Sequence, residues 1–122
     1  MVLIDTDVLI DYLRGDTSVK KQVEELWKTN HACVSVLSVY ELYAGIRPGE
    51  EDDISNLLAP MNILAVNHSV AAKAGQRRNH YRSQGVTLGD IDCIIAGTAM
   101  LGGMQVFTRN IKHYPDIDIY IG

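Results

Sequence analysis

Acidic residues stand beside the apolar segments of this chain. Asp5 directly follows the first apolar run, Glu41 comes soon after the second, and Asp92 lies within a long apolar segment near the C-terminus. Asp92 is the only charged residue from 91 to 104, so we expect its carboxylate to be buried without a Lys or Arg partner from that segment. Such a carboxylate takes up a proton or binds a cation. For Asp92 the pattern therefore favours a metal-binding or catalytic role over a structural one.

The residue types also indicate which cation such a site would hold. Carboxylates that converge without His or Cys form a hard oxygen site, which suits Mg²⁺ or Mn²⁺. An ion of this kind binds phosphate oxygens, activates a water molecule and stabilises the leaving oxygen of a phosphodiester. The four His have no metal-ligand spacing, and the two Cys, 60 residues apart, are expected to be buried free thiols. No P-loop, GxSxG or GxGxxG motif is present, which argues against the common nucleotide-binding and hydrolase classes.

Local structure offers another explanation for several of these acids. Asp5 follows a strand and is a good helix N-cap, and Asp90 is placed to cap the last helix. Ser38 and Glu41 have the spacing of a capping box, and on local pattern alone capping is the better interpretation of Glu41. A capping Glu would still lie near the carboxyl end of the preceding strand, so its position agrees with either role.

Two uncharged side chains follow the last apolar run, in "VFTRN". Asn110 could supply a neutral oxygen ligand or a turn, and Thr108 could hold a water molecule or an acidic side chain. The residues themselves leave both choices open.

Short apolar runs alternate with segments of helical periodicity. The runs that predict strands are 2–4, 32–37, 62–66 and 105–108, with a weaker one at 117–121. Helices are predicted between them, the last two over 68–84 and 90–101. Continuous apolar strands are typical of a parallel sheet covered on both faces. The sequence therefore predicts one α/β domain over residues 1–122, a three-layer α/β/α fold around a mainly parallel sheet of 4–5 strands, with ligands beyond the carboxyl ends of the strands.

Charge is unevenly distributed. The formal net charge is −4, which does not suggest nucleic-acid binding, yet residues 54–89 contain no Asp or Glu. Lys73, Arg77, Arg78 and Arg82 all lie in that stretch. They form either a solvated helix surface or a patch that attracts phosphate. No apolar run is long enough to cross a membrane, and Asp5 and Asp7 interrupt the N-terminal run where a signal peptide would be apolar, so a cytoplasmic protein is expected.

Four segments together resemble one family. "LIDTDVLI", "SVLSVYELYAG", "DIDCIIAGTAML" and "VFTRNIKHY" look like a PIN domain of the VapC toxin type, in order and over essentially the whole chain. The resemblance implies a metal-dependent ribonuclease, the toxin of a type II toxin–antitoxin pair. It also implies a homodimer and a small antitoxin protein that binds at the active cleft.

The resemblance can be carried over residue by residue. Asp5, Glu41 and Asp92 match the first three family acids, and Thr108 matches a family hydroxyl near them. The fourth acid, often Asp, falls on Asn110, which leaves the site one negative charge short unless Asp90 or Asp7 contributes. Asp7 is otherwise expected beside the site or facing the substrate, and Asp11 on the helix surface.

These matches define the predicted site. The resemblance implies that an Mg²⁺ or Mn²⁺ ion positions a water molecule for attack on an RNA phosphate. The predicted catalytic residues are Asp5, Glu41, Asp92, Asn110 and Thr108; the predicted metal ligands are Asp5, Asp92, Glu41 and Asp90; the predicted RNA contacts are Arg77, Arg78, Arg82 and Arg109.

Two other classes of protein compete with this prediction. The "DTDV" segment also resembles the DxDx(T/V) start of haloacid-dehalogenase-like phosphatases, and "LGDID" faintly resembles their later acidic motif. However, 122 residues are few for that fold, and its Thr/Ser and Lys motifs are missing. The Asn at position 110 also leaves room for a PIN-like module that binds RNA or protein with weak or no catalysis.

Overall fold

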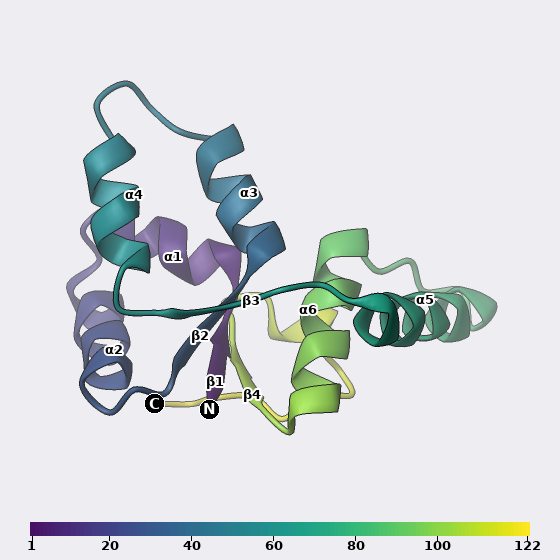
Figure 1. Ribbon diagram of the computed structural model, residues 1–122. Helices are drawn as coiled ribbons and strands as arrows, with labels where there is room; N and C mark the ends of the chain where they lie inside the picture. The colour runs from purple at the N-terminus through teal and green to yellow at the C-terminus, as the bar shows by residue number, and fades with distance from the viewer.

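The computed structural model describes residues 1–122 as six α-helices around a four-stranded parallel sheet (Figure 1). The strands are β1 Val2–Ile4, β2 Ala32–Ser35, β3 Asn62–Leu64 and β4 Gln105–Phe107. The helices are α1 Thr6–Leu13, α2 Thr17–Lys28, α3 Val36–Ala44, α4 Glu51–Leu58, α5 His68–Ser83 and α6 Asp90–Gly102, and a short 3₁₀ turn covers Ile111–His113. The predicted three-layer α/β fold with a parallel sheet is confirmed.

Strand β1 lies inside the sheet, whose order is β3-β2-β1-β4. Its end is in register with the end of β4, because Ile4 pairs with Phe107. The next residue, Asp5, donates its backbone N–H to the Phe107 carbonyl at 2.9 Å. Parallel pairing thus brings the segments that follow β1 and β4 to the same edge of the sheet, as predicted for the carboxyl ends of such strands.

Two apolar clusters cover the two faces of the sheet. Val2 and Ile4 pack with buried residues of α1, α2, α3 and α4, whereas Leu3 packs with buried residues of α6. This alternation follows from the period of two along a strand. Figure 1 shows α1, α2 and α4 on one side of the sheet, and α6 with α5 outside it on the other. Both faces are therefore buried, which explains why the strands are apolar throughout.

Two predicted elements differ from the observed ones. The apolar run 32–37 is only partly strand, because Ser35 ends β2 and its side chain caps α3 by accepting from the Leu37 N–H. The weak strand predicted at 117–121 is reduced to one isolated bridge between Ile119 and Val106. Its backbone hydrogen bonds to β4 involve Val106 alone, so no ladder forms. None of the helices has the length and apolar composition needed to span a membrane.

Candidate functional site

Asp5 lies at the carboxyl end of β1 and is 5% exposed. One carboxylate oxygen accepts the Thr6 N–H at 2.8 Å, so Asp5 caps α1, in agreement with the local pattern. The other accepts the Thr108 hydroxyl at 2.9 Å and lies 3.1 Å from the Tyr114 hydroxyl. Capping and site formation are thus compatible, because each uses a different oxygen.

Asp92 lies in the first turn of α6 and faces the same hydroxyl. Its Oδ1 is 3.2 Å from the Tyr114 oxygen, and its Oδ2 is 3.0 Å from Nδ1 of His113. The Asp92 side chain is 24% exposed, so it is half-buried rather than enclosed as the sequence suggests. Asp5 and Asp92, 87 positions apart in the chain, therefore share one phenol group.

Glu41 reaches the cluster through Thr6. The Thr6 hydroxyl donates to Glu41 Oε1 at 2.6 Å and lies 3.0 Å from the Ser38 hydroxyl. The predicted capping box is wrong, because α3 begins at Val36 with Ser35 as its cap, which places Ser38 and Glu41 inside the helix. Glu41 is consequently free of the helix terminus and points toward the residue that follows Asp5.

Asp7 stands on the solvent side of the same group. Its Oδ1 accepts the Val8 N–H at 2.7 Å, and its Oδ2 accepts the Arg109 N–H at 2.9 Å and the Asn110 side-chain amide at 3.1 Å. The segment after β4 therefore presents both predicted polar residues to acids of the site, Thr108 to Asp5 and Asn110 to Asp7.

Other predicted site residues have partners elsewhere. Asp90 pairs with Arg78 at 2.9 Å, points outward and does not cap α6, whose N-cap is Gly89. The guanidinium of Arg109 pairs with two acids of the α1 region, Asp11 at 3.0 Å and Asp16 at 2.9 Å. These pairs lie at the rim of the acid cluster, and they place Asp90 outside it.

The prediction that Arg77 contacts RNA is wrong. Its side chain is 2% exposed and pairs with Asp116 at 2.7 Å, while a second hydrogen bond at 2.9 Å reaches the His113 carbonyl. A guanidinium enclosed in this way is not available to an RNA phosphate. Arg77 instead fixes the segment that carries His113 and Tyr114 against α5. Arg82 is exposed, as an RNA contact must be.

The acids of the cluster lack cationic partners. Neither Asp5, Asp7 nor Glu41 lies within 4.0 Å of a side-chain nitrogen of a Lys or Arg, and the only ion-pair partner of Asp92 is a His. Burial, with a contribution from nearby Asp7, raises the pKa of Asp5 to about 6. Burial also raises the pKa of Asp7. The folded chain thus concentrates carboxylates whose repulsion a cation would relieve.

The donor set consists of oxygens, which is the chemistry that Mg²⁺ and Mn²⁺ prefer. No three His, Cys, Asp or Glu side chains already surround one point. The Tyr114 hydroxyl contacts both Asp5 and Asp92, and Glu41 contacts the Thr6 hydroxyl. The residues present therefore fit a hard divalent ion in their chemistry.

Tyr114, His113 and Thr6 are site residues that the sequence pattern does not single out. The "VFTRNIKHY" segment is recognisable, but its spacing alone does not show that the 3₁₀ turn 111–113 brings Tyr114 back over Asp5. Thr6 carries no charge, and only the packing of α1 against α3 places it beside Glu41. A buried Tyr hydroxyl needs a partner, which is the one signal that points to Tyr114.

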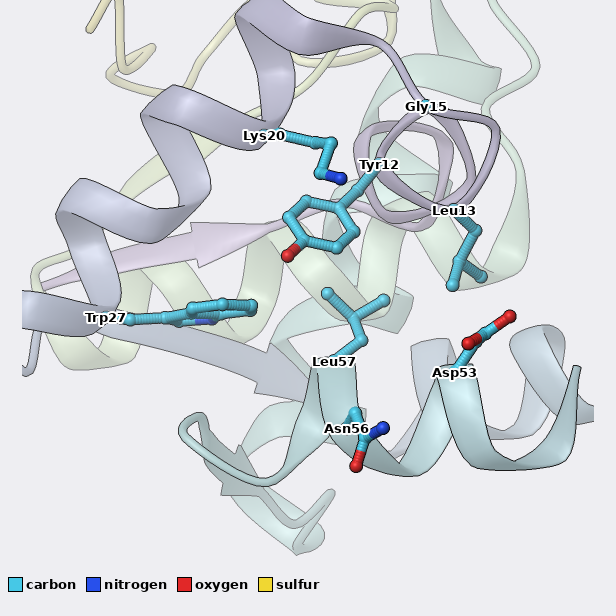
Figure 2. Close-up of a pocket in the computed structure, with 8 residues that line it drawn as sticks. All are labelled: Tyr12, Leu13, Gly15, Lys20, Trp27, Asp53, Asn56 and Leu57. Carbon is cyan, nitrogen blue, oxygen red and sulfur yellow. The ribbon is translucent and has the colours of Figure 1, made fainter.

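A separate pocket of about 440 Å³ lies between α1, α2 and α4 (Figure 2). Tyr12 and Trp27 meet there with ring centroids 5.4 Å apart, and Lys20 Nζ lies 5.5 Å from the Tyr12 ring centre. Trp27 Nε1 is buried without a hydrogen-bond partner. The pocket contains none of the acids described above.

Comparisons with known proteins agree with the geometry. The family model of the PIN domain matches residues 2–118. Ribonuclease VapC10 of Mycobacterium tuberculosis is 33% identical over 115 residues, which cover 94% of this chain and 86% of that protein. The crystal structure of FitAcB from Neisseria gonorrhoeae superposes with a TM-score of 0.80 at 26% identity, covering 98% of this chain and 96% of that one.

A toxin–antitoxin complex from Klebsiella pneumoniae has a TM-score of 0.79 at 25% identity, with 96% and 92% of the two chains covered. The phosphatase alternative is therefore wrong, since the match to the PIN model extends over nearly the whole sequence. A family model that spans 2–118 and a ribonuclease that is one-third identical lead to the same conclusion: the chain belongs to the PIN domain family, as a ribonuclease toxin of the VapC type.

Proposed function

We propose that this chain hydrolyses RNA phosphodiester bonds with Asp5, Glu41 and Asp92 as the ligands of Mg²⁺ or Mn²⁺. The observation that carries the proposal is a group of carboxylates at one sheet edge that share hydrogen-bond donors and lack any Lys or Arg partner. PIN-type VapC ribonucleases are typically metal-dependent. When bound, a divalent ion supplies positive charge to the phosphate and lowers the pKa of a water molecule.

The protein groups position the carboxylates. Thr108 and the Thr6 N–H orient Asp5, so that its carboxylate presents a defined set of lone pairs. The Tyr114 hydroxyl keeps Asp5 and Asp92 beside each other, and His113 fixes the second oxygen of Asp92. Orientation of this kind avoids reorganisation during the reaction, which is how preorganised sites lower barriers.

Contacts to the RNA backbone come from the exposed basic side chains. Arg82 and Lys73 lie on the exposed surface of α5, and Arg109 lies at the rim of the acid cluster. Arg78 is half-buried beside Asp90, so it contributes less. Phosphate contacts of this type hold the strand without reading its sequence.

Purified protein provides the test. We expect wild type to cleave RNA with Mg²⁺ or Mn²⁺, and Asp5→Asn and Asp92→Asn to lower the cleavage rate at least about 100-fold, since each removes a charged ligand. Asp90→Asn is the matched control, because it removes one acid of the same helix that pairs outside the cluster. EDTA should abolish the cleavage by wild type.

Equal cleavage by wild type and the Asp5 and Asp92 variants would contradict the proposal and indicate a contaminating nuclease. A protein that binds Mn²⁺ or RNA but never cleaves would support the binding-module alternative. Growth arrest on expression of wild type, and none with Asp92→Asn, would extend the test to toxicity.

A cognate antitoxin is the second part of the proposal. The similar Klebsiella pneumoniae structure is a toxin–antitoxin complex, which supports a partner of the same kind here. The family resemblance implies binding at the active cleft, and the pocket between α1, α2 and α4, where Tyr12 and Trp27 meet, offers aromatic surface to a further segment of that partner.

Trp27 is the only Trp of the chain, so its fluorescence reports on this pocket. We expect co-expression with any small protein encoded beside this gene that proves to be its antitoxin to yield a complex in which Trp27 emission is shifted and shielded from acrylamide. Unchanged emission in a stable complex would place the antitoxin elsewhere.

We also infer a homodimer. Helix α3 exposes Val36, Tyr40 and Tyr43, which are spaced i, i+4 and i+7 and therefore lie on one face. Tyr residues on an exposed apolar face are typical of protein interfaces.

A further inference from the structure

We infer that Asp7 supplies the fourth negative charge of the metal site and that Asn110 positions it, so that this Asp–Asn pair is equivalent to the exchanged pair, with an amide at position 7 and the acid at position 110. This inference rests on the proposed metal-dependent function. It concerns a residue otherwise expected only to lie beside the site, and it decides between the two acids that could make up the missing charge.

The contacts place Asp7 where the segment after β4 ends. Its Oδ2 accepts both the backbone N–H of Arg109 and the side-chain amide of Asn110, at 2.9 and 3.1 Å. Asn110 Nδ2 is thus directed at the carboxylate, and the Asn110 backbone N–H is tied to the Thr108 hydroxyl at 3.0 Å. The same Thr108 hydroxyl donates to Asp5, so one short segment aligns both Asp5 and Asp7.

Ion pairing separates the acids around the site into two groups. Asp11 and Asp16 share Arg109, and Asp90 pairs with Arg78, so these charges are already compensated. No side-chain nitrogen of a Lys or Arg pairs with Asp7. Arg109 contributes only its backbone N–H, and its guanidinium pairs with Asp11 and Asp16 instead. The half-buried carboxylate of Asp7 is thus oriented by three N–H donors, and no neighbouring cation compensates its charge.

The exchange has a simple physical consequence. A hydrogen-bonded Asp–Asn pair carries one negative charge whichever position holds the acid, so the two arrangements supply the same total charge to the site. Two acids facing each other at 3.1 Å would instead repel, and two amides would leave the site one charge short.

The exchange is tested with Mn²⁺ titration calorimetry on six forms of the purified chain. They are wild type, Asp7→Asn, Asn110→Asp, the double variant that combines these two substitutions, and the comparison variants Asp5→Asn and Asp90→Asn. We expect Asp7→Asn to weaken Mn²⁺ binding at least about 10-fold, in the range seen when carboxylates near a metal are removed. The double variant should regain affinity to within about threefold of wild type. Asp90→Asn, which also removes one acid, should change the affinity less than about threefold. Thermal melting without metal confirms that each variant is folded.

The possible results separate this inference from the proposed function. Loss of affinity in Asp5→Asn but not in Asp7→Asn would overturn the role of Asp7 and leave the metal site standing. A double variant no better than Asp7→Asn would overturn the exchange. Absence of Mn²⁺ binding by the wild type would overturn both. Equal losses in Asp7→Asn and Asp90→Asn would show that only the overall charge matters, which also contradicts the inference.

Discussion

At the scale of single residues, Asp5 has two roles, as the N-cap of α1 and as an acid of the candidate site. Its carboxylate caps α1 with one oxygen and presents the other to Thr108 and Tyr114. Burial and nearby Asp7 raise its pKa to about 6, above the ordinary value of 3.8. A folded state that raises the pKa of an acid is less stable when that acid is charged. The metal-free site therefore carries the cost of a buried carboxylate, to which repulsion from Asp7 adds, and a bound cation would offset both.

The raised pKa of Asp5 predicts how metal-free stability depends on pH. Because the folded pKa is higher than the unfolded one, the stabilising contribution is complete below about pH 4 and is lost as pH rises through about 6. We expect the free energy of unfolding to increase by about 1 kcal/mol between pH 7 and pH 5 on account of Asp5. Urea denaturation in EDTA at pH 5, 6 and 7 measures this free energy of unfolding for the metal-free protein.

Asp5→Asn provides the control for this prediction. Without a titratable group at position 5, the variant should show a flatter profile between pH 5 and pH 7 than the wild type does. A profile that stays as steep after the substitution would assign the effect to another acid. Adding Mn²⁺ at pH 7 should stabilise wild type and leave the variant unchanged.

Residue types predict part of this site and cannot predict the rest. Asp5 and Asp92 are recognisable because a charge inside or beside an apolar run must have a reason. The contacts of Tyr114 with Asp5 and of Asn110 with Asp7 span 109 and 103 positions, and no local pattern encodes them. Arg77 is instead a residue that the sequence wrongly includes. As a basic residue on a basic helix it is predicted to contact RNA, but it is buried and pairs with Asp116.

At the scale of elements, the contact between α5 and α6 sets the position of Asp92. Gly97 of α6 packs so closely on α5 that an added Cβ would lie 3.2 Å from the Ala74 nitrogen and 3.2 Å from the Val70 carbonyl oxygen. Both neighbours are backbone atoms, which cannot move away as a side chain end could. The closeness of the two helices therefore depends on the absence of a side chain at position 97.

Gly97→Ala should destabilise the protein. The added methyl group must push α5 and α6 apart, and overpacking of this kind costs about 1–3 kcal/mol, which outweighs the gain in helix propensity of about 1 kcal/mol. Gly75→Ala on α5 is the matched control, because nothing lies within 4 Å of the point that its methyl group would occupy, and it should stabilise the helix by up to about 1 kcal/mol. Thermal or urea unfolding measures the change in stability of each variant. Equal changes in Gly97→Ala and Gly75→Ala would contradict the close contact between α5 and α6 as the cause.

The order of the elements is predictable from the sequence. The boundary between two elements is not predictable where both lie within one apolar run. Apolar residues flank Ser35 on both sides within 32–37, yet Ser35 both ends β2 and caps α3. Hydrophobic runs do not reveal such a change of element, so the sequence pattern assigns the capping role to Ser38 instead. The shift matters for function, because it moves Glu41 from the helix terminus to the face that meets Thr6.

At the scale of the whole molecule, three separate surfaces have different proposed roles. The acids gather where β1, α3 and α6 approach each other, while the pocket of Figure 2 lies beyond α1, between α2 and α4. The exposed Tyr residues of α3 form a third surface. Separate surfaces allow substrate, antitoxin and a second copy of the chain to be tested by independent substitutions.

The homodimer is the prediction that belongs to this scale. We expect the chain to sediment at twice its 13.5 kDa monomer mass, and Tyr40→Glu to shift it to the monomer, because a charge would be buried at the centre of an apolar interface. Tyr40 is 66% exposed in the single chain, so the substitution should leave the fold intact. Leu101→Glu, at an apolar residue 53% exposed on α6, is the control that should remain dimeric. A Tyr40→Glu variant that stays dimeric would place the interface elsewhere, and a monomeric wild type would contradict the dimer itself.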